Sequence, residues 1–201
     1  MIKNIFLVRH GQSEHNLRNV FAGSSVNEKL TSKGENDAAL VSKEISKSNE
    51  VISHIFHSPL RRSRQTALII QNNLEKKYSQ KIKMTCIDGL VEVNVGLFSG
   101  KSQEEVKKLY LTSAEYFQNR DFENWDFPSG ENYHQILDRV EKAMQEILKF
   151  SQNSKSIIVV GHAMINRVII SRYFSKEIAK SKKFHFDHQT VMKIKLEGLD
   201  K

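Results

Sequence analysis

The sequence predicts an α/β protein of three layers, with a mostly parallel central sheet covered by helices on both faces. Short apolar runs of strand length alternate along the chain with longer segments whose apolar residues recur at helical spacing. The run 156–160, Ser-Ile-Ile-Val-Val, is almost wholly apolar, which is typical of a central strand covered on both sides. The 201 residues, of which 39% are hydrophobic, suit one domain with a full core, so we expect 1–201 to be a single domain.

The first half of the chain is expected to supply three strands and two helices. The strands cover 2–8, 51–56 and 81–87, and the helices cover 31–47 and 60–78. In the second helix Ala67, Ile70 and Leu74 recur at intervals of three and four residues, which places them on one face. Pro59 stands just before that helix, where its fixed φ does no harm.

The second half is expected to supply three helices and two strands. The helices cover 102–109, 131–150 and 163–173, and the strands cover 156–160 and 190–196. Ser102 and Glu105 form the capping-box pattern that opens a helix. Segment 101–130 is expected to form a lid or cap over the active site, and most of its aromatic residues are expected to pack into a small core.

Composition excludes several classes of protein. A single cysteine, Cys86, excludes an intrachain disulfide and a multi-cysteine metal site. No apolar run reaches the roughly 18–20 residues of a membrane span, and the apolar N-terminal stretch is too short for a signal peptide, so we expect a cytoplasmic protein. The formal net charge of +8 fits a binder of small anions or of nucleic acid, but the excess is spread along the chain rather than gathered in a tail.

Charged and histidine side chains follow the ends of the expected strands. The residues concerned are Arg9 and His10 after the first strand, Arg62 after the second, Glu92 after the third and His162 after the fourth. Ligands of parallel sheets bind beyond the carboxyl ends of the strands. We therefore expect these side chains to converge on one ligand site.

The motifs around these residues resemble the histidine phosphatase, or phosphoglycerate-mutase-like, superfamily, and they occur in that family's order from residue 2 to about 195. They are Arg9-His10-Gly11-Gln12-Ser13-Glu14-x-Asn16, Leu30-Thr31-x-x-Gly34, Ser58-Pro59-Leu60-x-Arg62-x-x-Gln65-Thr66-Ala67, Leu90-x-Glu92-x-x-x-Gly96-x-Phe98-x-Gly100 and Gly161-His162. The resemblance implies a phosphoglycerate-mutase-like fold, and its phosphatase branch implies a phosphomonoesterase of the histidine acid phosphatase type.

The resemblance also implies a role for each site residue. His10 would be the nucleophile that forms a phosphohistidine, with a backbone carbonyl holding its other ring nitrogen, and Glu92 would be the general acid and later the base. Four residues would line the phosphate pocket: Arg9, Asn16, Arg62 and His162. Ala163 is expected to help bind the phosphoryl group at the helix start, and Glu131 to contribute to the pocket rim.

We expect no metal and no other cofactor, because the arginine and histidine side chains supply the positive charge that a metal would otherwise give. The pair His185-x-x-His188 is the nearest pattern to a metal site, but it lacks an acidic or thiol partner at usable spacing. The expected partner is a small phosphorylated substrate, with no membrane or nucleic-acid partner, and the protein is expected to be a monomer or a homodimer.

Two alternatives to a phosphatase remain. A bisphosphoglycerate-dependent mutase normally carries Glu-Arg-His-Tyr-Gly in the third motif, whereas this chain has Glu-Val-Asn-Val-Gly at 92–96. The interval of 70 positions from Glu92 to His162 also leaves little room for the mutase insertion. A non-catalytic binder of phosphoanions or nucleic acid is the other alternative. Its best basic stretch contains Arg172, Lys176, Lys180, Lys182 and Lys183.

Overall fold

The computed structural model describes residues 4–151, 154–181 and 185–195. The strands are β1 (Asn4–Arg9), β2 (Ile52–His57), β3 (Lys83–Cys86), β4 (Ser156–Gly161) and β5 (Val191–Lys195). The helices are α1 (Glu14–Leu17), α2 (Ser32–Lys47), α3 (Arg61–Tyr78), α4 (Gln103–Leu109), α5 (Leu111–Gln118), α6 (Tyr133–Phe150), α7 (Ala163–Tyr173) and α8 (Lys176–Lys180). Four short 3-10 turns lie at Gly23–Ser25, Asp88–Leu90, Gly96–Phe98 and Phe122–Asn124.

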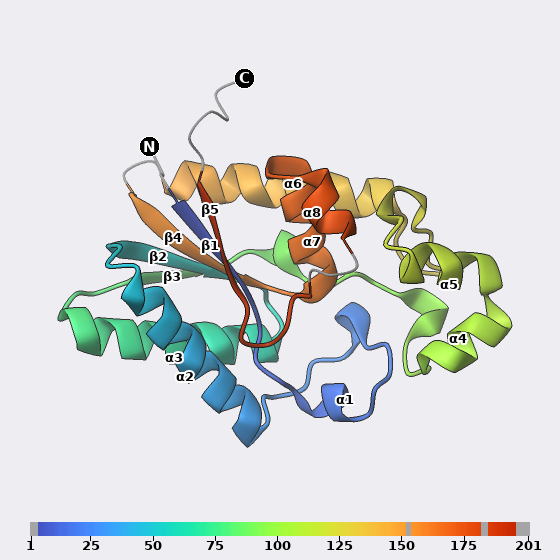
Figure 1. Ribbon diagram of the computed structural model, residues 1–201, viewed down its shortest axis with the longest axis horizontal. Coiled ribbons are helices and arrows are strands. Elements are labelled where there is room, and N and C mark those ends of the chain that lie inside the picture. The colour runs from blue at the N-terminus through green and yellow to red at the C-terminus, as the bar shows by residue number, and fades with distance from the viewer. Residues whose placement is uncertain (1–3, 152–153, 182–184, 196–201) are drawn as a thin grey trace.

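The five strands form one sheet in the order β3-β2-β4-β1-β5 (Figure 1). The first four strands are parallel, and β5 pairs antiparallel with β1. The predicted mostly parallel sheet is therefore confirmed. β4 lies between β1 and β2, as expected for the most apolar strand, and all six of its residues are buried.

Helices cover both faces of the sheet, so the predicted three layers are also confirmed. Alternate residues of β4 point to opposite sides: Ile157 and Val159 join the core beneath α6 and α7, and Ile158 and Val160 join the core beneath α2 and α3. Figure 1 shows α6 above the sheet and α2 and α3 below it.

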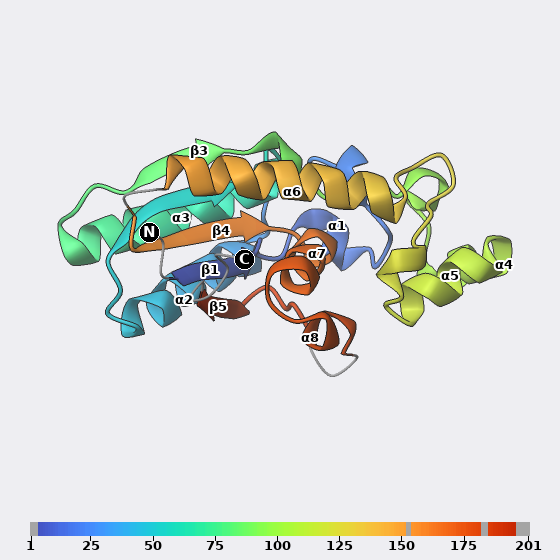
Figure 2. The ribbon, with the colours of Figure 1, turned by 90° about the horizontal axis from the view of Figure 1, so that it is seen from above.

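The segment expected to form a cap contains two helices where the sequence predicted one. Ser102 caps α4 through the predicted capping box with Glu105, and α5 follows after a single intervening residue, Tyr110. Figure 2 shows α4 and α5 at the end of the molecule to which β4 points. The aromatic side chains of Phe122, Trp125 and Phe127 are buried as predicted, but they belong to the core beneath α6 and α7 that also contains Ile157 and Val159, and do not form a small core of their own.

Candidate active site

Three neighbouring parallel strands bring the predicted residues to one edge of the sheet. β1 ends just before His10, β4 ends just before His162, and the next strand, β2, is followed by Ser58. The backbone N–H of His10 donates to Gly161 O over 3.1 Å, which ties the first strand end to the second. The ring centroids of His10 and His162 lie 5.0 Å apart.

His10 is buried and its two ring nitrogens have different partners. Nδ1 lies 2.7 Å from the carbonyl oxygen of Gly11, and because a carbonyl only accepts, Nδ1 carries the hydrogen. Nε2 is then a lone-pair acceptor, and Arg62 Nε donates to it over 3.2 Å. Burial, assisted by the charges of His162, Arg62 and Arg9, lowers the pKa of His10 well below its ordinary value. The imidazole is therefore neutral near pH 7.

The loop that holds His10 is itself fixed at Gly11. The Gly11 N–H donates to Thr66 Oγ1 over 3.0 Å, and the same hydroxyl donates to the carbonyl of Arg62 over 2.8 Å. A Cβ at Gly11 would lie 2.2 Å from the carbonyl oxygen of Gly34 at the start of α2, so only glycine allows this approach. The Gly11 carbonyl, which selects the His10 tautomer, is thus positioned by Thr66 on one side and by Gly34 on the other.

Two arginines flank His10, of which Arg62 is buried and Arg9 is half-buried. Arg62, in the first turn of α3, is 1% exposed, and its guanidinium also donates to Gly23 O and Val26 O. Burial lowers the pKa of Arg62 to about 10, which keeps it charged at pH 7. Arg9 donates from Nη1 to Phe186 O over 2.8 Å, and its buried Nε has no hydrogen-bond partner in the part of the chain that the structure describes.

His162 forms the N-cap of α7, which places the first N–H groups of that helix beside it. Its Nε2 shares a hydrogen bond of 2.7 Å with Ser58 Oγ, and its buried Nδ1 has no partner among the described residues. Burial and the nearby arginines lower the pKa of His162 well below its ordinary value. Ala163 is the first residue of α7, and its side chain is half-buried.

Asn16 is oriented by a closed set of hydrogen bonds. Its Oδ1 accepts from the backbone N–H and the hydroxyl of Ser13, over 2.9 and 2.8 Å. Its Nδ2 lies 3.1 Å from Nε2 of His15, and Nδ1 of His15 lies 3.0 Å from Ser13 Oγ. Burial lowers the pKa of His15 to about 4, so the ring is neutral at pH 7 and can accept from the amide.

Glu92 is buried, and its Oε1 accepts from the N–H of Val93 over 3.0 Å. Burial raises the pKa of this carboxyl, although both site arginines act in the opposite direction. A carboxyl that keeps its proton to a higher pH than usual is suited to donate it.

The loop that carries Glu92 is braced by Arg139 of α6. Arg139 donates from Nη1 to the carbonyls of Gly89 and Val91, over 2.8 and 2.9 Å. Its other nitrogens bind the two carboxylate oxygens of Glu131 over 2.6 and 2.9 Å. Glu131 Oε2 also accepts from the N–H of Asn94 over 2.7 Å. The structure therefore places Glu131 in the support of the Glu92 loop.

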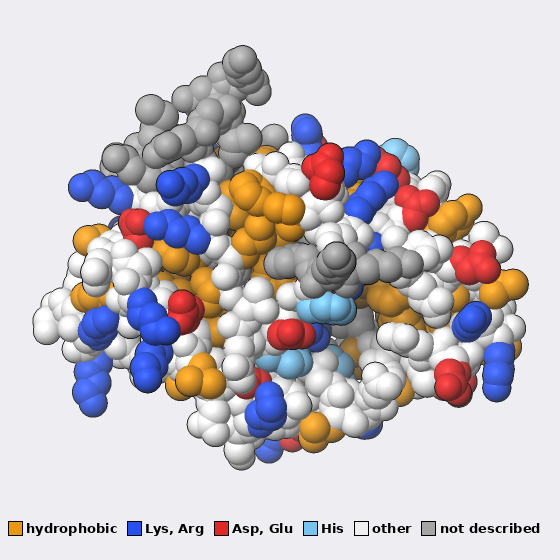
Figure 3. Space-filling view, viewed as in Figure 1, with side chains coloured by type: hydrophobic (Ala, Val, Ile, Leu, Met, Phe, Trp, Pro, Cys, Tyr) orange, Lys and Arg blue, Asp and Glu red, His pale blue; other side chains and the backbone are white. Residues whose placement is uncertain are grey.

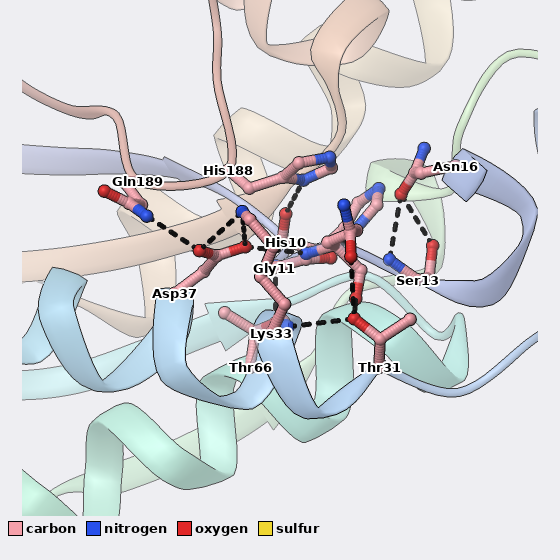
Figure 4. A network of polar contacts seen from close by, with 12 residues as sticks. His10, Gly11, Ser13, Asn16, Thr31, Lys33, Asp37, Thr66, His188 and Gln189 are labelled. Carbon is pink, nitrogen blue, oxygen red and sulfur yellow. Dashed lines mark hydrogen bonds and ion pairs between the residues drawn. The ribbon is translucent and has the colours of Figure 1, made fainter. Parts of the chain in front are cut away.

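The segment that precedes β5 also reaches the site (Figure 4). Because β5 pairs antiparallel with β1, with Val191 opposite Val8, the residues just before β5 lie beside the end of β1. His188 Nδ1 lies 2.7 Å from the carbonyl oxygen of His10. Next to it, Gln189 donates to the buried carboxylate of Asp37 in α2 over 2.8 Å.

Sequence reasoning thus named the strand-end residues and missed several of their partners. Ser58 and Thr66 stand inside the second motif, which was a signal for both. His15 fills an unspecified position of the first motif. For His188 the sequence suggests only a metal-ligand role, because it does not show that the last strand runs antiparallel beside β1.

Figure 3 shows histidine side chains gathered near the middle of one face, with most lysine and arginine side chains toward its margins. Over residues 4–151, 154–181 and 185–195, no group of three or more His, Cys, Asp or Glu side chains is placed to hold a metal ion. Within the same residues, no helix combines the length and the apolar character needed to cross a membrane. In the basic stretch from 172 to 183, ion pairs with acidic residues are formed by Arg172, Lys176 and Lys180, while Lys182 and Lys183 lie outside the described residues.

Comparison with known proteins gives a family match over nearly the whole chain. The model of the histidine phosphatase superfamily (branch 1) matches residues 5–200. The chain is 29% identical to phosphoserine phosphatase 1 of Hydrogenobacter thermophilus, over 98% of this chain and 88% of that protein. It is 28% identical to a 2,3-bisphosphoglycerate-dependent phosphoglycerate mutase of Bartonella henselae, over 85% of this chain and 81% of that protein.

Some relatives are much longer. The chain is 25% identical to human 6-phosphofructo-2-kinase/fructose-2,6-bisphosphatase 3 and spans 34% of its length. Among solved structures, Bacillus stearothermophilus YhfR superposes with a TM-score of 0.79 at 19% identity, covering 97% of this chain and 92% of that one. This likeness shows a shared fold.

Proposed function

We propose, because the chain belongs to the histidine phosphatase superfamily, that it is a metal-independent phosphomonoesterase acting on a small phosphorylated metabolite through a phosphohistidine intermediate. The observation that carries the proposal is the state of His10. This imidazole is buried and neutral, its Nδ1–H is fixed by a carbonyl, and its Nε2 lone pair lies against a guanidinium. The neutral ring and the fixed Nδ1–H leave Nε2 as the nucleophilic atom. The Arg62 guanidinium is placed to bind the phosphoryl oxygens once the substrate replaces its contact with Nε2.

Binding of the substrate places its phosphoryl oxygens among fixed donors. Arg62 is buried and Arg9 is half-buried, and their planar guanidinium forks match two phosphoryl oxygens at once. Asn16, His162 and the N–H of Ala163 supply further donors. A dianion beside His162 stabilises its protonated form, so the neutral ring of the free protein gains a proton as substrate binds.

Attack by His10 Nε2 on phosphorus breaks the bond to the ester oxygen. Glu92 gives its proton to the departing alkoxide, which is why its raised pKa supports the assignment. Glu92 then takes a proton from the water that attacks the phosphohistidine, which releases phosphate and restores neutral His10. The arginines stabilise the charge that develops on the phosphoryl oxygens in both steps.

We treat 1–201 as one domain in which segment 101–130 caps the leaving-group side of the pocket. The position of α4 and α5 beyond the carboxyl end of β4 supports this role (Figure 2). Glu131 directly follows that segment. Because both of its carboxylate oxygens accept hydrogen bonds from Arg139, we assign it to the support of the Glu92 loop instead of to substrate contact.

Hydrolysis is favoured over mutase activity by the third motif. Val93 and Val95 stand where the mutases carry arginine and tyrosine, and both valines are fully buried in the core, so neither can grip a substrate carboxylate. Retention of the phosphoryl group for return to a second hydroxyl needs such a grip. The intermediate is therefore open to water.

The proposal is tested with p-nitrophenyl phosphate and purified protein. Phosphate release is expected to persist in excess chelator, to be blocked by vanadate and to vanish in His10→Ala. Rapid quenching into base with radiolabelled substrate is expected to trap phosphate on Nε2 of His10. Undiminished turnover by His10→Ala would overturn the nucleophile, and 2- and 3-phosphoglycerate interconversion without net hydrolysis would overturn the phosphatase.

A further inference from the structure

His188 stands at the mouth of the proposed site and has no part in the reaction as described. Its ring centroid lies 5.5 Å from that of His10, a separation close to the 5.0 Å between His10 and His162. The side chain is half-buried. It is therefore near enough to the reacting centre to touch a substrate and open enough to be reached by one.

The contacts of His188 define which nitrogen carries the hydrogen. Nδ1 faces the carbonyl oxygen of His10, which only accepts, so Nδ1 is the N–H. Burial, with the charge of Arg9 nearby, lowers the pKa of His188 to about 4, and the ring is neutral at pH 7. Nε2 is then an acceptor. Within the described residues it makes no hydrogen bond.

The loop holds this acceptor in place. Gln189 donates to Asp37 Oδ1, Lys33 pairs with the same carboxylate, and Asp37 Oδ2 accepts from the N–H of Gln12 (Figure 4). Asp37 thereby joins the loop before β5 to the loop after β1. The acceptor is fixed before substrate arrives, which reduces the ordering needed on binding.

Because most polar groups of the site are hydrogen-bond donors, the acceptor Nε2 of His188 can bind only a part of the substrate that carries a donor. A lone pair repels phosphoryl oxygens, which are themselves acceptors, so Nε2 does not belong to the phosphate pocket. It matches a donor on the leaving alcohol. Among the charges that act on this ring, Arg9 has the largest effect, and together with Lys33 it opposes the Asp37 carboxylate, so an ammonium group is disfavoured. A neutral hydroxyl is the donor that fits.

Building on the proposed phosphatase function, we propose that His188 is a specificity residue whose Nε2 accepts a hydrogen bond from a hydroxyl group of the leaving alcohol. The favoured substrates are phosphate monoesters of polyhydroxy alcohols. An alcohol without the hydroxyl leaves Nε2 unpaired when the pocket closes around it, and is turned over with kcat/KM about tenfold lower.

The test compares glycerol 1-phosphate with 2-methylbutyl phosphate, in which methyl groups replace both hydroxyls. The readout is the ratio of their kcat/KM values, since any general loss from a displaced His10 cancels in it. The wild type is expected to prefer glycerol 1-phosphate about tenfold or more. His188→Asn places an amide N–H near the position of Nδ1 but has nothing at Nε2. The ratio of kcat/KM values is therefore expected to fall toward the value it has without a hydrogen bond to the substrate hydroxyl.

His188→Gln is the matched variant, because its amide oxygen lies near the position of Nε2 while the donor at Nδ1 is lost. It is expected to keep most of the preference. His185→Asn, the same change at an exposed neighbour, is expected to leave the ratio unaltered. A purely structural role for His188 predicts the reverse order, with His188→Asn keeping the ratio and the activity while His188→Gln loses activity on both substrates.

Three outcomes would overturn the inference. They are an unchanged ratio in His188→Asn, a wild type without preference, and a preference for 2-aminoethyl phosphate over 2-hydroxyethyl phosphate. Turnover of p-nitrophenyl phosphate by the wild type separates this result from the proposed function. If that turnover is absent, the phosphatase itself fails, whereas its presence with an unchanged ratio refutes only the role of His188.

Discussion

His10 and His57 occupy matching places at the ends of two parallel strands, β1 and β2. Both side chains are buried, and each ring lies with Nδ1 against the carbonyl oxygen of the next residue, over 2.7 and 2.8 Å. The two differ in what faces the rest of the ring. Arg62 donates to Nε2 of His10, whereas no such donor to His57 is seen among the described residues, and the charge found there to act on its pKa is that of Arg64.

The difference arises on α3, which carries both arginines. Arg62 is 1% exposed and lies against His10, whereas Arg64, two residues further along, lies on the exposed side of the helix. A strand end with a following carbonyl is therefore enough to fix a neutral histidine. The chemistry proposed for His10 needs, in addition, charges that other elements bring to it.

The largest effect is expected when the same substitution is made at both histidines. Asparagine keeps an amide N–H near the position of Nδ1 and removes Nε2. His10→Asn is expected to lower kcat for p-nitrophenyl phosphate by about 10⁴-fold or more, because it removes the attacking atom. His57→Asn is expected to stay within about threefold of the wild type. Steady-state kinetics on both purified variants, with circular dichroism to verify folding, gives the answer, and comparable losses at the two positions would contradict the distinction.

Much of the fold could be predicted because its signals are local. The apolar run at 156–160 and the helical spacing of Ala67, Ile70 and Leu74 each report burial by one element, and all five strands were placed to within a few residues. The capping box of Ser102 predicted the start of α4. The sequence around Tyr110 contains no comparable pattern to predict that α4 ends there and α5 begins.

The site was less predictable where it depends on pairing between distant segments. Strand ends located Arg9, His10 and His162, because a parallel sheet collects its carboxyl ends at one edge. His188 lies there only because β5 runs antiparallel beside β1, and the sequence around it gives no direction of pairing. Glu131 was expected at the pocket rim, and its pairing with Arg139, eight residues later on α6, could not be read from either residue alone.

A smaller effect is expected from Glu131, which acts on Glu92 only indirectly, through Arg139 and the loop that Arg139 holds. Glu131→Gln leaves Arg139 with a weaker partner and loosens the loop that carries Glu92. We expect kcat to fall about tenfold for alkyl phosphates, whose departing alkoxide needs a proton, and less for p-nitrophenyl phosphate, whose leaving group is stable as an anion. The alkaline limb of the pH–rate profile should move for the alkyl substrate, because that limb reports loss of the proton from Glu92.

Glu141→Gln is the control for that change, since Glu141 forms an ion pair with Arg172 on the protein surface. Exposed pairs contribute little, so its kinetics should match the wild type. Equal losses on the alkyl and aryl substrates in Glu131→Gln would mean general damage to the fold, and would refute a positioning role through Glu92.

The smallest effect expected is on the pH dependence of the free energy of unfolding, to which His10 and His57 should contribute in the same direction. Burial lowers the pKa of six histidines, namely His10, His15, His54, His57, His162 and His188. Between pH 6.5 and the lowered values, which reach about 4 for His15 and His188, the unfolded chain binds more protons than the folded one. The free energy of unfolding should therefore fall as pH drops from 6.5 toward 5. Glu92, with its raised pKa, acts in the opposite sense but is one group against six.

Urea unfolding at pH 7.5, 6.0 and 5.0 measures this slope. His10→Asn and His57→Asn should each make the slope shallower, equivalent to up to about one proton fewer taken up on unfolding. Each variant removes one ring that is neutral in the folded protein and gains a proton when the chain unfolds. A stability that is flat or rises on acidification would contradict the neutral state of the buried rings. A reduced slope in both variants, with activity lost in only one, would show that the two strand ends share their electrostatics of burial and that His10 differs through the arginines around it.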